Sequence, residues 1–120
     1  MEKKIIEFAP PLLGMELVFN TFRIGGKLAK ELKPGDTVIL ADSKNKIAFG
    51  QARVESIDFG ELWEMCMQHA SRNHLEQGFD DKTNSPARIY GVLQKFYGPQ
   101  IVNPNKKSTV VYLRRIPDDC

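Results

Sequence analysis

Residues 33–57 read KPGDTVILADSKNKIAFGQARVESI, and this stretch predicts a β-hairpin. The KPGD segment is a turn, because proline presets φ at the second position and glycine supplies a positive φ at the third. The run TVILA over residues 37–41 then predicts a strand. A polar loop over 42–46 separates it from a second predicted strand over 47–57.

Hydrophobic spacing and capping residues predict the other elements. Ser85 and Pro86 are typical of a helix start, and Gly98 is typical of a helix end. We expect further strands over 4–8, 20–24 and 108–116, and helices over 10–18, 27–32, 61–77 and 85–97. This mixed order predicts an α+β fold, in which helices pack on a small curved sheet or barrel.

Composition indicates one globular domain over residues 1–120. Hydrophobic residues make up 42% of the chain and charged residues 27%, which excludes a disordered, collagen-like or membrane-embedded chain. The 17 basic and 15 acidic residues leave a net charge of +2, less than a non-specific duplex binder usually carries. Cys66 and Cys120 form neither a disulfide framework nor a zinc set. With no secretory signal at the start, the cytoplasm is the expected compartment.

Several short segments, taken in order, resemble the ASCH domain, a relative of the PUA domain. They are NTFR at 20–23, LKPGD at 32–36 followed by TVIL, a helical segment with Trp63, His69, Asn73 and His74, FYG at 96–98, and VVYLRR at 110–115. The resemblance covers roughly residues 4 to 116. It implies a small PUA-like β-barrel with helices beside a cleft, and binding of RNA or a modified nucleoside there.

Some members of the ASCH family are amidohydrolases that deacetylate acetylcytidine. Their motif reads Gly-x-Lys-x-x-x-x-Arg, with a threonine nucleophile just after the lysine. With Arg23 at the arginine position, Glu16, Val18 and Phe19 stand at the glycine, lysine and threonine positions. Valine cannot accept a proton and phenylalanine cannot attack a carbonyl, so this alignment predicts that the deacetylase chemistry is absent.

Thr21 and Arg23 are the leading candidates for ligand binding. They are two residues apart on an extended segment, so they point to one face. The planar guanidinium of Arg23 suits a phosphate or a base edge, and Thr21 can donate a hydrogen bond. The alternative is a structural Arg23 paired with an acid such as Asp36.

Two groups of cations could bind a phosphate backbone. Lys27, Lys30 and Lys33 recur every three residues on a short helix, where they form either a cationic ridge or a solvated face. The second group is Lys106, Lys107, Arg114 and Arg115. Arg114 and Arg115 are consecutive in a strand, so at most one of them joins any single patch.

Trp63, Tyr90, Tyr97 and Tyr112 are the aromatic residues that could stack on an unpaired base. Tyr97 and Tyr112 are the preferred candidates, because they lie on elements that the resemblance places beside the cleft. Asn73, on the predicted long helix, is a further ligand-binding candidate.

His69 lies four residues before Asn73 on that helix and could act as a general base. Its neighbours Met65 and Cys66 favour a buried, hydrogen-bonded histidine instead. Cys66 and His69 lack a local third ligand, so no metal site is expected, and a cysteine on an apolar stripe favours packing over nucleophilic use.

Three functions remain open from the sequence. The first is a module that binds RNA or a modified nucleoside, without a cofactor. The second is a nucleic-acid or nucleoside hydrolase, a ribonuclease or amidohydrolase with a rebuilt site that uses Thr21, Lys27 or His69. The third is a protein-interaction domain; a monomer or weak dimer fits any of these functions.

Overall fold

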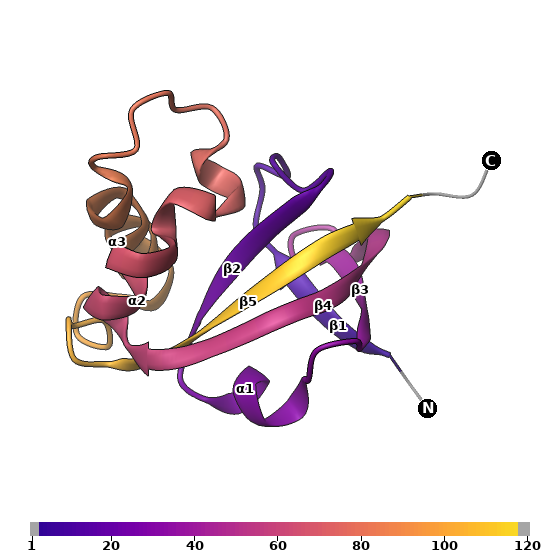
Figure 1. The fold of residues 1–120 in the computed structure, drawn as a ribbon, viewed down its shortest axis with the longest axis horizontal. Coiled ribbons are helices and arrows are strands. Elements are labelled where there is room, and N and C mark those ends of the chain that lie inside the picture. Colours follow the sequence, from indigo (N-terminus) through magenta and orange to yellow (C-terminus); the bar gives the residue numbers. More distant parts are fainter. Residues whose placement is uncertain (1–2, 118–120) are drawn as a thin grey trace.

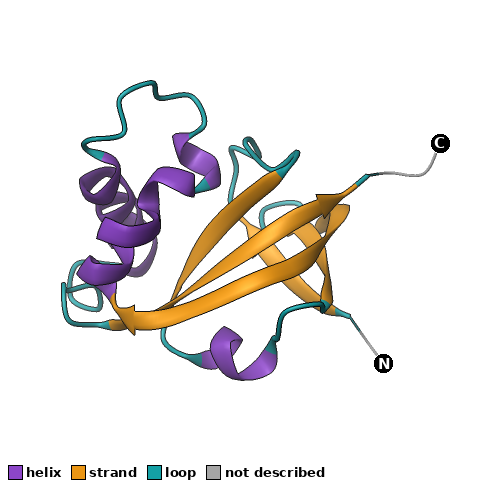
Figure 2. Cartoon of the chain, viewed as in Figure 1, coloured by secondary structure: helices purple, strands orange, loops and turns teal. Residues whose placement is uncertain are grey.

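The computed structural model describes residues 3–117. The strands are β1 (Lys4–Phe8), β2 (Val18–Ile24), β3 (Thr37–Asp42), β4 (Ile47–Glu61) and β5 (Lys107–Ile116). The helices are α1 (Lys27–Glu31), α2 (Leu62–His69) and α3 (Ser85–Tyr97), with two 3-10 turns, Ala70–Arg72 and His74–Glu76, after α2. Figure 2 shows the helices gathered mainly at one end of the sheet.

All five strands form one mixed sheet in the order β1-β3-β4-β5-β2. β1 runs parallel to β3, and the other neighbouring pairs are antiparallel. The sheet curls into a half-barrel with β1 and β2 at its two edges (Figure 1). Register shifts in β3–β4 and β4–β5 mark bulges, which increase local twist and so help the sheet to curl. The predicted α+β fold with a curved mixed sheet is confirmed.

The two faces of the sheet bury two separate cores. Alternate residues of β5 divide between them: Val111 and Leu113 lie inside the half-barrel, whereas Val110 and Tyr112 face the helices. The barrel core also contains Phe8, Phe19, Leu40 and Val54, and the helical core contains Phe22, Leu62, Met65, Cys66, Ile89 and Leu93.

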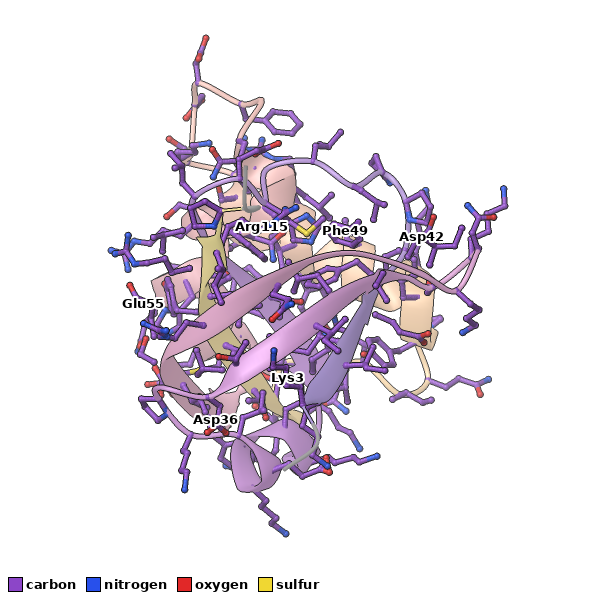
Figure 3. All side chains as sticks on the ribbon, turned by 90° about the vertical axis from the view of Figure 1, so that its right-hand side faces the viewer. Lys3, Asp36, Asp42, Phe49, Glu55 and Arg115 are labelled. Atoms are coloured by element: carbon purple, nitrogen blue, oxygen red, sulfur yellow. The ribbon has the colours of Figure 1, made fainter. Side chains whose placement is uncertain are left out.

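Arg115 closes one end of the half-barrel. It donates hydrogen bonds to the carbonyl oxygens of Met15 at 2.9 Å and Phe49 at 3.0 Å, and its guanidinium lies over the Phe49 ring (Figure 3). Gly50 leaves room for this side chain, because a Cβ there would lie 2.5 Å from the guanidinium. Arg114 pairs instead with Glu55 at 3.0 Å.

The helix predicted over residues 10–18 is wrong. Residues 9–17 follow an irregular path, and β2 already begins at Val18. Gly14 has φ +73°, which no right-handed helix allows, and a Cβ there would lie 2.1 Å from the His74 carbonyl oxygen. Leu12, Leu13 and Leu17 stay exposed along this path, whereas Met15 is buried in the barrel core.

The helix predicted over residues 61–77 is too long at its C-terminal end. β4 continues to Glu61, and α2 ends at His69. Asn73 is extended, and its side chain accepts a hydrogen bond from the Leu75 backbone N–H, which caps the second 3-10 turn. This local bond competes with helix continuation. His69 and Asn73 therefore do not share a helix face.

Cys66 is buried, and Cys120 lies outside the described residues. Within residues 3–117, no helix is both long and apolar enough to cross a membrane.

Candidate functional site

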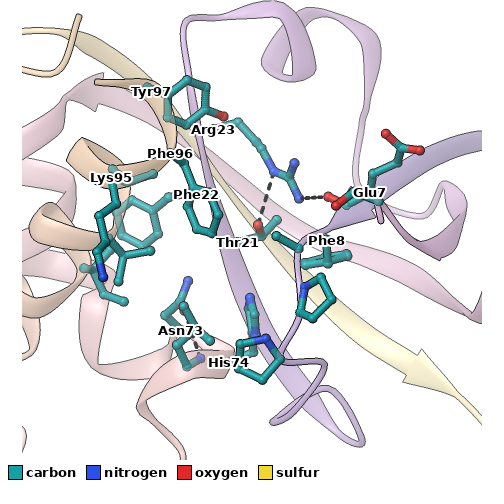
Figure 4. A pocket seen from close by; sticks show the side chains of 18 residues that line it. Glu7, Phe8, Thr21, Phe22, Arg23, Asn73, His74, Lys95, Phe96 and Tyr97 are labelled. Carbon is teal, nitrogen blue, oxygen red and sulfur yellow. Dashed lines mark hydrogen bonds between the residues drawn. The ribbon is translucent and has the colours of Figure 1, made fainter. Parts of the chain in front are cut away.

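A pocket of about 840 Å³ opens where the curled sheet fails to close, between its two edge strands and the last helix (Figure 4). Its walls come from four segments and from Ser43, in the loop after β3. The four segments are the end of β1 with the residues after it (Glu7–Pro11), the centre of β2 (Thr21–Arg23), the segment Asn73–Leu75, and the inner face of α3 from Ile89 to Tyr97.

Arg23 contributes a half-buried cation to this pocket. Its Nε donates to Thr21 Oγ1 at 3.3 Å, its Nη2 donates to the Glu7 carbonyl oxygen at 2.8 Å, and its guanidinium lies over the Phe8 ring. Burial lowers the pKa of Arg23, although Tyr97 and Glu7 oppose this shift. Among residues 3–117, no carboxylate forms a salt bridge with Arg23, because the Glu7 carboxylate pairs with Lys46 at 3.0 Å.

The alternative pairing of Arg23 with Asp36 is wrong. Asp36 accepts instead from the Lys33 backbone N–H at 3.1 Å, within its own turn. The expected common face of Thr21 and Arg23 is present, since the two side chains are hydrogen-bonded to each other.

His74 also lines the pocket, and one hydrogen bond fixes its tautomer. Its Nδ1 lies 3.0 Å from the Leu13 carbonyl oxygen, so Nδ1 carries the hydrogen and Nε2 is left as the acceptor. Burial lowers the pKa of His74, and Arg23 lowers it further, against the opposing effect of the bond to Leu13. The ring edge packs against Phe8 and Phe19, which fixes its orientation.

The end of α3 provides an aromatic and basic wall. Phe96 and Tyr97 line the pocket together with Lys95, and the buried Ile89 and Leu93 on the same helix form its apolar floor. Phe96 is 60% exposed, unusual for so large an apolar side chain. An exposed aromatic ring beside a pocket can stack on a planar ligand.

Asn73 lines the pocket, but its amide is already occupied. Its Nδ2 donates to the Asn20 carbonyl oxygen at 3.2 Å, and its Oδ1 accepts from Leu75. Asn20 in turn donates to the His69 carbonyl oxygen at 2.8 Å. These bonds attach the segment after α2 to β2 and so position His74.

The structure brings together four of the residues singled out in the sequence: Thr21, Arg23, Asn73 and Tyr97. The other four candidates do not line this pocket. Two of them, Lys27 and Lys30, are exposed on α1. The other two, His69 and Tyr112, lie where α2 packs on the sheet. The candidate catalytic residues Thr21, Lys27 and His69 therefore do not form one site.

Sequence reasoning missed His74, Lys95 and Phe96. The predicted helix through residue 77 placed His74 on a different face from His69. Because α2 ends at His69, His74 instead begins a 3-10 turn, and its direction does not follow from helix periodicity. For α3, the sequence did hold a signal: Lys95 and Phe96 directly precede Tyr97 at the helix end.

His69 is hydrogen-bonded through both ring nitrogens. Nδ1 lies 2.8 Å from the Tyr112 hydroxyl and Nε2 lies 2.7 Å from Asp58 Oδ2. Cys66, one turn earlier on α2, is fully buried, and burial raises the pKa of its thiol to about 12. Among residues 3–117, no three histidine, cysteine or acidic side chains are grouped to hold a metal ion.

No protein-family model matches this sequence, and no curated protein matches it. Similarity appears at the level of solved structures. A hypothetical protein, PH0355, is similar over 96% of this chain and 100% of its own, with a TM-score of 0.65 and 16% identity.

Two ASCH structures are also similar. The ASCH protein from Zymomonas mobilis matches over 92% of this chain with a TM-score of 0.50 and 16% identity. The ASCH domain from Lactobacillus crispatus JV V101 matches over 85% with a TM-score of 0.52 and 8% identity. This chain spans 65% of the length of each of these two chains. The half-barrel with its helices is thus an ASCH-like fold, as the sequence resemblance implied.

Proposed function

We propose that the pocket binds one nucleoside, either free and modified or as an unpaired base of RNA. The observation that carries this proposal is Arg23, a half-buried cation without a carboxylate partner among the described residues. A charge removed from water is stable only when it is paired or hydrogen-bonded. Its two hydrogen bonds use part of the five N–H donors of a guanidinium, and the rest are available to a ligand oxygen.

The other walls fit a nucleoside. The volume of about 840 Å³ lies within the usual range for small-molecule sites. Phe96 and Tyr97 offer surfaces for base stacking, and Nε2 of His74 can accept a hydrogen bond from an amino group of a base. Lys95 at the rim adds a cation for a phosphate.

The ASCH-like fold supports the same ligand class, because RNA or nucleoside binding is what resemblance to that family implies. The proposal does not include deacetylation. Val18 is at the surface of β2 and Phe19 is completely buried in the barrel core, and neither side chain can perform the steps assigned to lysine and threonine.

The test is a titration of the protein with nucleosides, including acetylcytidine, by calorimetry, and with short single-stranded RNA by fluorescence anisotropy at two salt concentrations. Arg23→Met keeps most of the side-chain volume and removes the charge. We expect it to weaken nucleoside binding at least tenfold, since hydrogen bonds to charged groups contribute about 1.5–3 kcal/mol.

Lys27→Met is the matched control, because it removes a cation from α1, outside the pocket. We expect unchanged affinity for a free nucleoside in this variant. Unchanged affinity in Arg23→Met, or equal losses in both variants, would contradict the proposed site. RNA binding that depends on Lys27 but not on Arg23 would instead place the RNA on α1.

A further inference from the structure

Four side chains form a continuous hydrogen-bonded chain on the helix-facing side of the sheet, outside the pocket. Asp58 on β4 contacts His69 at 2.7 Å, His69 contacts the Tyr112 hydroxyl at 2.8 Å, and Arg72 Nη1 donates to the same hydroxyl at 3.1 Å. Asp58 and Tyr112 lie 11 and 43 residues from His69 in the sequence, so only the tertiary fold brings the three together.

The partners fix where the protons lie. The Asp58 carboxylate accepts, so Nε2 of His69 carries a hydrogen and Nδ1 is the acceptor in the neutral ring. The Tyr112 hydroxyl therefore donates to Nδ1, while Arg72 donates to the Tyr112 oxygen. A hydroxyl whose proton faces a base, oriented by a carboxylate, has the arrangement of an activated nucleophile.

This chain is held rigidly but reaches solvent. Asn20, fully buried, donates to the backbone carbonyl oxygen of His69, and the ring of His69 packs edge-on against that of Tyr112. The side chain of His69 is 13% exposed and that of Asp58 is 44% exposed. Tyr112 is half-buried and Arg72 is exposed, so a substrate can approach from the side of Arg72.

The surrounding charge favours an anionic substrate. Arg114 lies two residues from Tyr112 on β5 and shares its face. Arg53 on β4 is the direct cross-strand partner of Arg114, and both are exposed. Like charges directly opposite each other destabilise a sheet, and Glu55 pairs with only one of the two. A phosphate beside Arg72 would be bound by the cation that already contacts the Tyr112 oxygen.

We propose that Asp58, His69, Tyr112 and Arg72 form a catalytic site that cleaves a phosphodiester, with Tyr112 as the nucleophile. The Tyr112 oxygen attacks phosphorus, and its proton moves to Nδ1 of His69. The bond from phosphorus to the leaving oxygen breaks on the far side of phosphorus, where that oxygen takes a proton from a water molecule. His69 stays an imidazolium, stabilised by Asp58. Arg72 stabilises the negative charge on the non-bridging oxygens.

Water completes the reaction. The hydroxide left by that water attacks phosphorus from the far side and breaks the bond to Tyr112, while His69 still carries the proton on Nδ1. The proton returns to the Tyr112 oxygen, and a phosphomonoester leaves. The reaction requires no oxidant, reductant or cofactor.

The first test is labelling with diisopropyl fluorophosphate, read by mass spectrometry of the intact protein and its peptides. The reagent forms a bond from Tyr112 oxygen to phosphorus and loses fluoride. The chain has three tyrosines, so Tyr90 and Tyr97 are internal controls. We expect Tyr112 to be labelled at least tenfold faster than either. Equal labelling of the three would overturn the proposal.

Two variants distinguish a Tyr112 hydroxyl that His69 activates from one whose hydrogen bonds only stabilise the fold. His69→Gln should slow labelling of Tyr112 about 10²-fold, the lower end of general-base effects, and Asp58→Asn should slow it in the same direction. Glu64→Gln, at an exposed carboxyl on α2, is the charge-matched control and should leave the rate unchanged. Thermal unfolding checks each fold, and a folded Asp58→Asn or His69→Gln with full labelling would overturn the proposal.

Hydrolysis of bis(p-nitrophenyl) phosphate tests the substrate class, with neutral p-nitrophenyl acetate for comparison. We expect Tyr112→Phe to abolish diester hydrolysis. Labelling without diester hydrolysis, or full hydrolysis in folded Tyr112→Phe, would overturn the phosphodiester assignment. These readouts do not involve Arg23, so this proposal and nucleoside binding in the pocket can fail separately.

Discussion

Arg23 and Glu7 join the two edges of a sheet that does not close. Arg23 on β2 donates at 2.8 Å to the backbone carbonyl oxygen of Glu7 on β1, although these strands lie at opposite ends of the strand order. The same guanidinium faces the pocket. One side chain therefore connects the edges and presents a charge at the opening between them.

The first prediction concerns the effect of that charge on stability. Burial lowers the pKa of Arg23, which means that the folded protein disfavours its charged form. We expect Arg23→Met to change the free energy of unfolding by less than about 1 kcal/mol, because lost desolvation offsets lost hydrogen bonds. Urea unfolding of the wild type and the variant measures this change in the free energy of unfolding. A loss above about 3 kcal/mol would mean that the contact with Glu7 is needed mainly for the fold.

The second prediction tests the position of His74. Gly14→Ala places a Cβ 2.1 Å from the His74 carbonyl oxygen and puts alanine at φ +73°. We expect a loss of about 3 kcal/mol, from left-handed strain of about 1–2 kcal/mol plus overpacking of about 1–3 kcal/mol. Gly25→Ala is the control, since φ is +87° there but no atom lies within 4 Å. Thermal unfolding compares the stability losses of the two variants. Equal losses would show that the contact of the new Cβ with the His74 backbone adds nothing to the strain at positive φ.

The third prediction concerns acid stability. Glu76 is 1% exposed. Hydrogen bonds from Arg88, and to a smaller extent one from Ser85, lower the pKa of its carboxyl against the opposing effect of burial. The ionised Glu76 carboxylate therefore contributes its full stabilisation to the folded protein above the unfolded pKa of about 4.3. This stabilisation is lost as pH falls through the lower pKa of the folded state. Glu76→Gln should cost about 3 kcal/mol at pH 7, because it leaves Arg88 without its buried partner.

That difference between wild type and Glu76→Gln should shrink in urea unfolding curves recorded from pH 7 to pH 3. Glu31→Gln is the control, because its pair with Lys4 is more exposed and such surface pairs contribute at most about 1 kcal/mol. A constant difference at every pH would contradict a role for the ionised carboxylate.

The fourth prediction concerns Cys66. Burial raises the pKa of its thiol to about 12, so hardly any thiolate exists at pH 8. In a Cys120→Ser background, we expect iodoacetamide to label Cys66 only as fast as the protein unfolds. Labelling followed across urea concentrations measures this, and rapid labelling of the native protein would show that α2 opens locally.

Local sequence patterns determined most of the secondary structure. The turn at Lys33–Asp36, the hairpin that follows it and the helix from Ser85 to Tyr97 depend on proline, glycine and short-range spacing. The common face of Thr21 and Arg23 also follows from the period of an extended strand. These features need no information from distant parts of the chain.

Only the tertiary structure decided where the apolar segment around Gly14 runs and where α2 ends. Gly14 packs against the backbone of His74, and Asn73 is bonded to Asn20, a residue of β2. Hydrophobic spacing cannot report such contacts, because their partners are more than 50 residues away. The chain of Asp58, His69 and Tyr112 has the same origin: the register of β4 on β5 and the packing of α2 bring its members within hydrogen-bond distance.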